Sequence, residues 1–216
     1  MEFDLRLMAK PDRYKIMGSS ITPRPIAWIT SLSAAGVRNA APYSFFNMMG
    51  DTPPTIALGL LAGTGGGFKD TATNIRETGE FVVNLVCEAQ AEAMNLTCMD
   101  APPGVDELTA AGLDTLPSTA VAPPRIAGAP VSFECRTLHL LETGPGQSVV
   151  IGEVLVAHIG DAFILDPERH HLDTLAMKLI ARMHGSGWYA RSTDLFQMAR
   201  PTYADWLARA DGADEA

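Results

Sequence analysis

A glycine-rich stretch that leads into a predicted helix carries the clearest chemical signal of the sequence. Residues 62–68 read Ala-Gly-Thr-Gly-Gly-Gly-Phe, and Lys69 and Thr71 follow at the start of a helix predicted over 69–78. Free backbone N–H groups, the positive end of a helix dipole, an ammonium group and a hydroxyl together favour a bound phosphate. The alternative is an ordinary mobile loop that ends in a helix cap, and this stretch alone does not separate the two.

The same stretch does not match the two common nucleotide motifs. A P-loop has glycine directly before its lysine and serine or threonine directly after it. Here Phe68 precedes Lys69, and Asp70 follows it. A dinucleotide-binding loop needs a sixth-position glycine, where Phe68 stands. The signal is therefore a phosphate site without a nucleotide fingerprint.

Metal binding and nucleophilic catalysis find little support. His170, His171 and Asp173 are adjacent, but no two of them share a helix face at i and i+4, so a solvated helix start is expected and no metal site. His139 and His158 lie in strand patterns, as packed or surface histidines do. The three cysteines form no C-x-x-C pair, which indicates reduced thiols, and Cys87 ends an apolar strand as an inert buried thiol.

The elements that must position these residues are mainly strands. Apolar and β-branched runs predict strands over 26–31, 37–46, 55–60, 81–86, 131–142 and 149–159, with a short edge segment at 164–165. Helices are expected over 69–78, 88–96 and 172–183. Residues 100–130 are expected to form a loop with one helical turn near 105–111, and residues 1–20 an irregular arm with a short start at 14–17. Asp70 or Thr71 is the expected cap of the helix 69–78, and Gly79 its stop. The first three strands form an expected antiparallel meander, and six or more antiparallel strands favour closure into a barrel.

Composition limits the class of partner. The chain has 216 residues, 47% of them hydrophobic and 19% charged, with a net charge of −9. Such a chain has enough apolar residues to form a core. Its negative net charge argues against a nucleic-acid duplex or an anionic membrane as the main partner, because both need a cationic surface. The N-terminus has no apolar run and no stretch reaches the ~18 apolar residues of a membrane span. We therefore expect one cytoplasmic domain, since no repeat or composition shift marks a boundary.

Five motifs in register resemble one family. They are Thr-Pro-Arg-Pro-Ile-Ala-Trp-Ile-Thr-Ser at 22–31, Asn-Ala-Ala-Pro-Tyr-Ser-Phe-Phe-Asn at 39–47, Asp-Thr-Pro-Pro-Thr-Ile at 51–56, Lys-Asp-Thr-Ala-Thr-Asn-Ile at 69–75 and Gly-Glu-Phe-Val-Val-Asn at 79–84. In this order they resemble the flavin reductase-like family of FMN-binding split barrels, especially its flavoredoxin-type branch, as do Gly-Trp-Tyr at 187–189 and Arg-Pro at 200–201. The resemblance covers about residues 10–203 as a single domain, which leaves an N-terminal arm at 1–9 and a polar tail at 204–216, and is weakest over 100–130.

The resemblance implies a fold, a cofactor and an activity. The implied fold is a mainly β, antiparallel split barrel with peripheral helices, and the implied assembly is a homodimer with FMN bound non-covalently near its interface. The implied activity is NAD(P)H:flavin reductase-type electron transfer. A non-catalytic FMN-binding electron carrier is the alternative, and an enzyme resembling pyridoxamine-phosphate oxidase fits the motifs less well.

The resemblance also implies site residues. Lys69 and Thr71 would lie at the FMN phosphate with Arg24 as a second cation, Thr30 and Ser31 at the ribityl chain or phosphate, and the segment 39–44 along the flavin ring. The full cofactor-binding set is Arg24, Trp28, Ile29, Thr30, Ser31, Asn39, Ala40, Ala41, Pro42, Tyr43, Ser44, Lys69, Asp70 and Thr71. For Trp28, Phe45 and Phe46 the alternative is core packing.

His184 is the one candidate catalytic side chain. In related flavin reductases a residue of this C-terminal region approaches the nicotinamide or the flavin. The alternative is a histidine at a helix C-terminus, with Gly185 as the stop. Hydride transfer to a flavin needs no dedicated acid or base, so the lack of a hydrolytic triad is expected.

Overall fold

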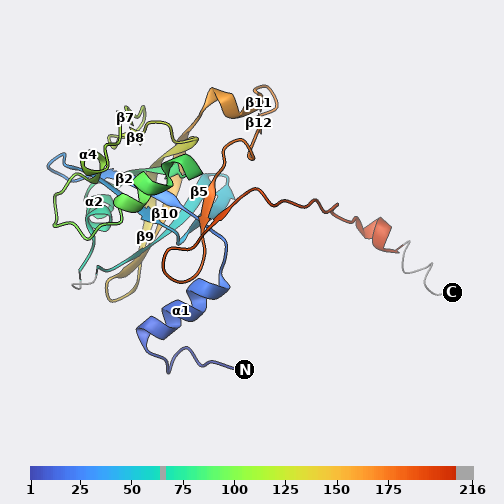
Figure 1. Ribbon diagram of the computed structural model, residues 1–216, viewed down its shortest axis with the longest axis horizontal. Helices are drawn as coiled ribbons and strands as arrows, with labels where there is room; N and C mark the ends of the chain where they lie inside the picture. Colours follow the sequence, from blue (N-terminus) through green and yellow to red (C-terminus); the bar gives the residue numbers. More distant parts are fainter. Residues whose placement is uncertain (64–66, 208–216) are drawn as a thin grey trace.

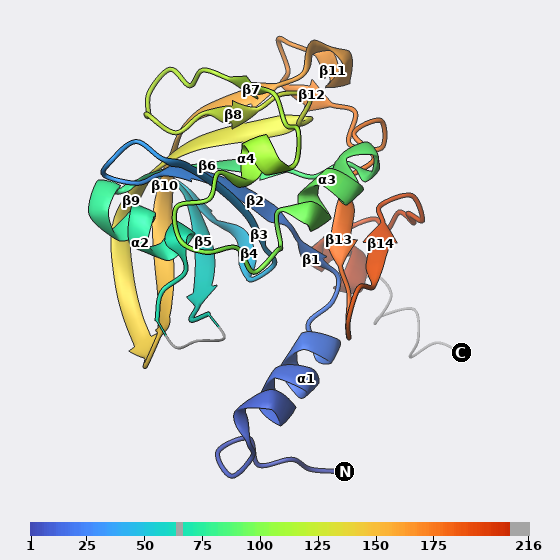
Figure 2. The same cartoon turned by 60° about the vertical axis from the view of Figure 1, so that its left-hand side comes forward.

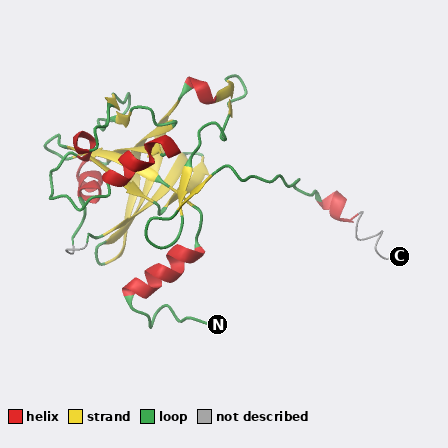
Figure 3. Cartoon of the chain, in the orientation of Figure 1, coloured by secondary structure: helices red, strands yellow, loops and turns green. Residues whose placement is uncertain are grey.

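The computed structural model describes residues 1–63 and 67–207, and its centre is one antiparallel sheet (Figures 1 and 3). Seven strands lie in the order β3-β2-β6-β9-β10-β5-β4. They are β2 (Ala27–Leu32), β3 (Arg38–Tyr43), β4 (Phe46–Asp51), β5 (Pro54–Leu61), β6 (Glu80–Leu85), β9 (Val131–Gly144) and β10 (Gln147–Ile159). The mainly β, antiparallel architecture expected from the sequence is confirmed.

The connection between the two edge strands closes this sheet. β3 and β4 stand at opposite ends of the strand order, yet only residues 44 and 45 separate them in the chain. The Gly59 N–H donates to the Phe45 carbonyl oxygen at 2.7 Å. A Cβ on Gly59 would lie 2.9 Å from that of Phe45, so glycine permits the close approach. The run 37–46, expected as one strand, is therefore divided, because its two ends pair with different neighbours.

Three smaller sheets surround the main one. The first contains β1 (Arg24–Pro25), β13 (Ile180–Arg182) and β14 (Tyr189–Arg191), and the other two pair β7 (Thr115–Leu116) with β8 (Arg125–Ile126) and β11 (Ile164–Asp166) with β12 (His171–Leu172). The predicted edge segment at 164–165 is thus confirmed. The loop expected over 100–130 also contains the β7–β8 hairpin.

The helices lie outside the sheet (Figure 2). They are α1 (Lys10–Ser20), α2 (Asp70–Thr78), α3 (Ala91–Leu96) and α4 (Glu107–Ala110), with 3₁₀ turns η1 (Glu88–Gln90) and η2 (Asp161–Phe163). Within the described residues no helix is long and apolar enough to cross a membrane. The helices expected over 69–78 and 88–96 and the turn near 105–111 are confirmed.

The two faces of β2 explain how the core is divided. Ala27 and Ile29 point into one apolar cluster with Phe81, whereas Trp28 points into a second cluster with Met94 of α3. Alternate residues of a strand face opposite sides of a sheet, so a strand covered on both sides is apolar throughout. Cys135 is buried in the first cluster, and all three cysteines are free thiols.

Three local predictions were wrong. Residues 10–20 form the helix α1 instead of an irregular arm, with a proline in the first turn and Asp12 close behind it, both favourable at a helix start. Residues 172–183 are not helical, because Ile180 donates to the Val86 carbonyl at 3.0 Å and pairs with Arg191, and this strand pairing overrides the apolar spacing. Neither Asp70 nor Thr71 caps α2, whose N-cap is Lys69 without a side-chain bond, although Gly79 ends it in the left-handed conformation with φ 73° as expected.

A buried carboxylate fastens the loop before β8 to the sheet. Glu134 on β9 has no exposed surface, and its oxygens accept hydrogen bonds from the backbone N–H groups of Thr119 at 2.8 Å, Ala120 at 2.5 Å and Val121 at 3.2 Å. His158 Nε2 lies 2.5 Å from the same carboxylate. Burial alone would raise the pKa of Glu134, but the hydrogen bonds from Thr119, His158 and Ala120 outweigh it and lower the pKa to about 2.

Glu134→Gln should destabilise the fold, since an amide presents N–H groups to donors that need an acceptor. We expect a loss of about 1–3 kcal/mol at pH 7 in urea unfolding. Because the folded pKa is depressed, the carboxylate's stabilisation is complete above the ordinary pKa of 4.5 and fades as pH falls towards 2. The variant should therefore lose the pH dependence of that window.

Glu153→Gln is the matched control. Glu153 lies on β10 and pairs with Arg136 at the surface at 3.1 Å. Such pairs contribute about 0–1 kcal/mol. Equal losses in the two variants would contradict the role given to Glu134.

Candidate functional site

A cavity of about 650 Å³ lies beside the edge strand β3. Small-molecule sites typically occupy about 300–1,000 Å³. Three segments line it: β3, the start of α2 with the loop before it, and the loop after α3. The lining residues are Asn39, Ala41, Pro42, Tyr43, Gly63, Gly67, Phe68, Lys69, Asp70, Thr71, Thr97, Cys98, Met99, Asp100, Ala101, Pro102, Pro103 and Glu107.

The free edge of β3 forms one wall of the cavity. The outward-facing backbone positions of this edge do not pair with a further described strand. Pro42 carries no N–H group, and the Ala40 N–H donates to Glu107 Oε2 at 3.1 Å. A proline and a side-chain acceptor both prevent another strand from pairing with an edge. This edge is thus available to a small ligand and closed to strand addition.

A chain of buried side chains fixes the floor of the cavity. Asn39 Oδ1 accepts hydrogen bonds from Thr71 Oγ1 at 2.7 Å and Ser31 Oγ at 3.2 Å, and Asn39 Nδ2 donates to Glu107 Oε2 at 2.9 Å. Asn74 Nδ2 donates to Ser31 Oγ at 3.0 Å. All five residues are buried. The network joins β2, β3, α2 and α4 and uses the Thr71 hydroxyl proton. Among the described residues that line this end of the cavity, Lys69 brings a cationic donor for an anion.

The loop after α3 forms the opposite wall and is held at both ends. Trp28 Nε1 donates to Thr97 Oγ1 at 2.9 Å, and the Gly104 N–H donates to Asp70 Oδ2 at 2.9 Å. Just beyond, Arg38 pairs with Asp106 at 2.6 Å. The fixed loop lines the cavity on the side that faces β3.

Two titratable side chains of the cavity stay protonated near neutral pH. Burial raises the pKa of Tyr43 to about 12, and the negative charges of Glu107 and Asp70 add to the rise. The Tyr43 hydroxyl is buried but makes no hydrogen bond with any described residue. Burial also raises the pKa of the Cys98 thiol, although Lys69 and Arg182 oppose the rise. The cavity therefore presents a hydroxyl donor without a described partner and a thiol that stays protonated near neutral pH.

The structure brings half of the predicted cofactor-binding residues to this cavity. Those that line it are Asn39, Ala41, Pro42, Tyr43, Lys69, Asp70 and Thr71. Ser31 and Ala40 lie behind the wall in the network, and Thr30 Oγ1 donates to the Pro124 carbonyl at 2.5 Å. Ile29 points into the first apolar cluster and Trp28 into the second. For Trp28 this is core packing, the alternative to a role at the flavin.

Arg24 and Ser44 lie outside the lining. Arg24 Nη1 donates to the carbonyls of Gly18 at 2.5 Å and Ile21 at 2.7 Å, Nη2 donates to Met183 at 2.8 Å, and Nε donates to Ser44 Oγ at 3.3 Å. A guanidinium group has five N–H donors, and four of these directions are taken by the protein. The structure therefore places Arg24 in contacts that hold the scaffold together, outside the lining of the cavity.

His184 lies in the turn between β13 and β14, away from the cavity lining. Its ring stacks on Trp188 with 6.3 Å between centroids and 11° between planes. The Met183 N–H donates to the Trp188 carbonyl at 2.9 Å and closes the hairpin. The predicted helix C-terminus is absent here, and Gly185 serves the turn, with φ 58°.

Sequence reasoning missed the whole wall at 97–103 and Glu107. These residues reach the cavity through side-chain bonds to Trp28, Asn39 and Asp70, at sequence separations of 34 to 69 residues. Hydrophobic periodicity carries no signal of such bonds. The one available hint was the expected helical turn near 105–111, which places Glu107 at a helix start.

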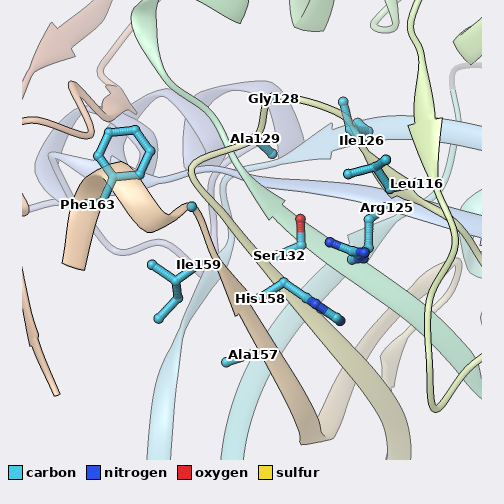
Figure 4. Close-up of a pocket in the computed structure, with 11 residues that line it drawn as sticks. Leu116, Arg125, Ile126, Gly128, Ala129, Ser132, Ala157, His158, Ile159 and Phe163 are labelled. Carbon is cyan, nitrogen blue, oxygen red and sulfur yellow. The ribbon is translucent and has the colours of Figure 1, made fainter. Parts of the chain in front are cut away.

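A second cavity, of about 490 Å³, lies between the β7–β8 hairpin and the end of β10 (Figure 4). Its polar side chains already have protein partners. Arg125 Nε and Nη2 donate to the Pro117 carbonyl, Ser132 Oγ donates to Asn84, and His158 faces Glu134. None of the residues predicted from the sequence lines it. The cavity beside β3 is therefore the better candidate site.

Comparison with known proteins agrees with this fold. Residues 17–171 match the family described as "Flavin reductase like domain". A relative of unassigned function from Deinococcus radiodurans is 39% identical over 217 residues, which cover 99% of this chain and 95% of the relative.

Solved structures match nearly the whole chain. Nitrilotriacetate monooxygenase component B from Bacillus cereus has a TM-score of 0.85 and 30% identity, covering 92% of this chain and 98% of its own. The 2-nitrobenzoate 2-nitroreductase of Pseudomonas fluorescens has a TM-score of 0.85 and 34% identity, covering 94% and 98%. Flavoredoxin of Desulfovibrio vulgaris, with a TM-score of 0.72 and 18% identity over 92% and 97%, shares the fold alone.

Proposed function

This chain belongs to the flavin reductase-like domain family, and from that premise we propose that it binds FMN in the cavity beside β3 and transfers electrons from NAD(P)H. The homodimer and the cytoplasmic location expected from the sequence are part of the proposal. The observation that carries it is the Tyr43 hydroxyl, buried at the cavity without a described partner. A buried donor without an acceptor costs about 1–3 kcal/mol, which a bound ligand with acceptor oxygens or nitrogens would relieve.

The chemistry of the lining suits FMN. Lys69 at the start of α2 offers a phosphate an ammonium group, together with the first N–H groups of the helix, which no side-chain cap occupies. Ala41 and Pro42 on the edge strand are small and leave room for a flat ring. The acidic side chain of Asp70 is turned to the Gly104 N–H, which lessens its repulsion of an anion.

The protein's share of the mechanism is to bind, orient and exclude water. When bound, FMN would supply the redox chemistry, accepting a hydride and giving up electrons to a second substrate. The Asn39 network holds β3 against α2, and the loop 97–103 covers the opposite side. The high pKa of Tyr43 keeps its hydroxyl a donor throughout the physiological pH range.

The final electron acceptor separates the proposals. The similarity to nitrilotriacetate monooxygenase component B favours a reductase that serves a second protein, and the similarity to 2-nitrobenzoate 2-nitroreductase favours direct reduction of a nitroaromatic compound. We place the reductase first, because it agrees with the family description. A non-catalytic carrier, as the flavoredoxin-type resemblance implied, is the alternative.

Anaerobic addition of NADH or NADPH to the FMN-loaded protein should bleach the visible flavin band, at a rate fast enough to support enzymatic turnover. A protein that holds FMN, is reduced by dithionite and is not reduced by either nicotinamide would be the carrier. A protein that takes up no FMN would refute both functions.

Lys69→Ala should weaken FMN by roughly 1–3 kcal/mol, the range for a charge-assisted hydrogen bond, and leave riboflavin affinity unchanged. Titration of the two flavins by fluorescence quenching provides the measurement. Arg169→Ala is the matched control, because this cation lies in the turn between β11 and β12, outside the cavity lining. Parallel losses of FMN and riboflavin affinity would remove Lys69 from the phosphate end.

Tyr43→Phe should leave the apoprotein at least as stable as the wild type, and more stable by up to about 1–3 kcal/mol, because it removes a buried hydroxyl that has no described partner. FMN affinity should fall about twofold to tenfold, the equivalent of one neutral hydrogen bond. Thermal unfolding of the apoprotein and flavin titration give the two readouts, with Tyr189→Phe outside the lining as control. An unstable apoprotein with normal FMN affinity would assign the hydroxyl to the fold.

A further inference from the structure

The chain beyond β14 leaves the domain as a long extension (Figures 1 and 3). We call residues 193–207 the C-terminal arm. Its large apolar side chains are exposed: Leu195 by 64%, Phe196 by 85%, Met198 by 78%, Tyr203 by 73% and Trp206 by 58%. Soluble monomers seldom expose such a contiguous series, which usually marks a protein or membrane contact. The net charge of −9 disfavours an anionic membrane.

The far end of the arm is preorganised. Thr202 Oγ1 donates to Asp205 Oδ2 at 2.7 Å, and the Trp206 N–H donates to the Thr202 carbonyl at 3.1 Å. This turn stacks Tyr203 on Trp206, with 5.7 Å between ring centroids and 16° between planes. A rigid aromatic pair is the kind of group that anchors protein interfaces.

The arm and α1 start from the same small sheet. α1 precedes β1, the arm follows β14, and both strands flank β13. Arg24 of β1 binds carbonyls at the C-terminal end of α1 and at Met183 beyond β13. α1 and the C-terminal arm therefore both start from fixed positions on one side of the barrel.

Beside these starting points lies an apolar face that no described residue covers. α1 buries none of its residues, and Tyr14 is 55% and Met17 49% exposed. Tyr14 approaches Phe45 at 6.1 Å between ring centroids, and Met48 and Met49 on β4 are 67% and 57% exposed. We call this the α1–β4 face.

We propose that the C-terminal arm of one chain packs on the α1–β4 face of a second copy, and the second copy's arm on the first. One chain carries both halves of the contact, and exchange about a two-fold axis satisfies both at once. The proposal rests on the homodimer of the proposed function and names the segments that hold it.

The area is sufficient for a stable dimer. An aromatic side chain buries about 150–250 Å². The exposed parts of Phe196, Tyr203 and Trp206 on two arms, with equal area covered on the receiving faces, amount to roughly 1,300–2,200 Å², close to the roughly 1,200–2,000 Å² of a standard protein interface.

Deletion of residues 193–216 tests the proposal. Ser192 is a suitable last residue, because its N–H and Oγ both bond to the Leu179 carbonyl and hold β14 in place. In sedimentation at micromolar concentration, the full FMN-loaded chain should have twice the 23.1 kDa chain mass. The shortened protein should be a monomer with the same circular dichroism spectrum.

Point variants keep the test independent of the deletion. Leu195→Ser and Met48→Glu should each raise the dimer dissociation constant about tenfold or more, as the loss of an interface anchor does. Leu165→Ser is the matched control, because Leu165 on β11 is 66% exposed against 64% for Leu195. It should leave the dimer unchanged.

The outcomes separate this inference from the proposed function. A shortened chain that remains a dimer overturns the arm contact, and normal FMN uptake in the same sample leaves the flavin proposal intact. A full-length monomer whose arm resists trypsin shows an arm packed on its own domain, which also overturns the inference. A dimer lost on deletion and weakened by Leu195→Ser, but not by Leu165→Ser, supports it.

Discussion

Only two residues connect the strands at opposite edges of the main sheet, and this short connection forces the sheet to close. Ser44 and Phe45 bring β3 and β4 together, and Gly59 admits the Phe45 backbone at 2.7 Å. The seam is not a regular ladder, so β3 keeps a free edge. The candidate site lies along that edge, where β3 pairs with β2 on one side and with no described strand on the other.

The N–H groups at a free strand edge need acceptors other than a neighbouring strand, and here Glu107 provides one. Its carboxylate accepts from the Ala40 N–H and from Asn39, which in turn accepts from Thr71. The Glu107 side chain therefore accepts the hydrogen bond at the edge of β3, orients Asn39 in the floor of the cavity and holds the loop after α3 beside it. The shape of the site and the termination of the sheet have the same cause.

The sequence predicted those parts of the fold that depend on local pattern. Strands at 26–31 and 81–86 were found because two-sided burial makes them apolar throughout, and Gly79 ended α2 as expected. Residues 172–183 were misread because leucines at helical spacing also suit a segment whose backbone pairs with Val86 and Arg191. The wall at 97–103 depends on side-chain bonds between distant segments, such as Trp28 to Thr97, which no local pattern encodes.

The place of Arg24 has an evolutionary consequence. Its guanidinium group reaches α1, the β13–β14 turn and Ser44 of the seam in four different directions. A lysine offers its three donors from a single atom and cannot span those acceptors. Selection for folding alone would therefore keep arginine at this position, even in a descendant that had lost every ligand. An arginine retained in a motif of cofactor-binding proteins can thus record the ancestry of a scaffold rather than the recognition of a phosphate.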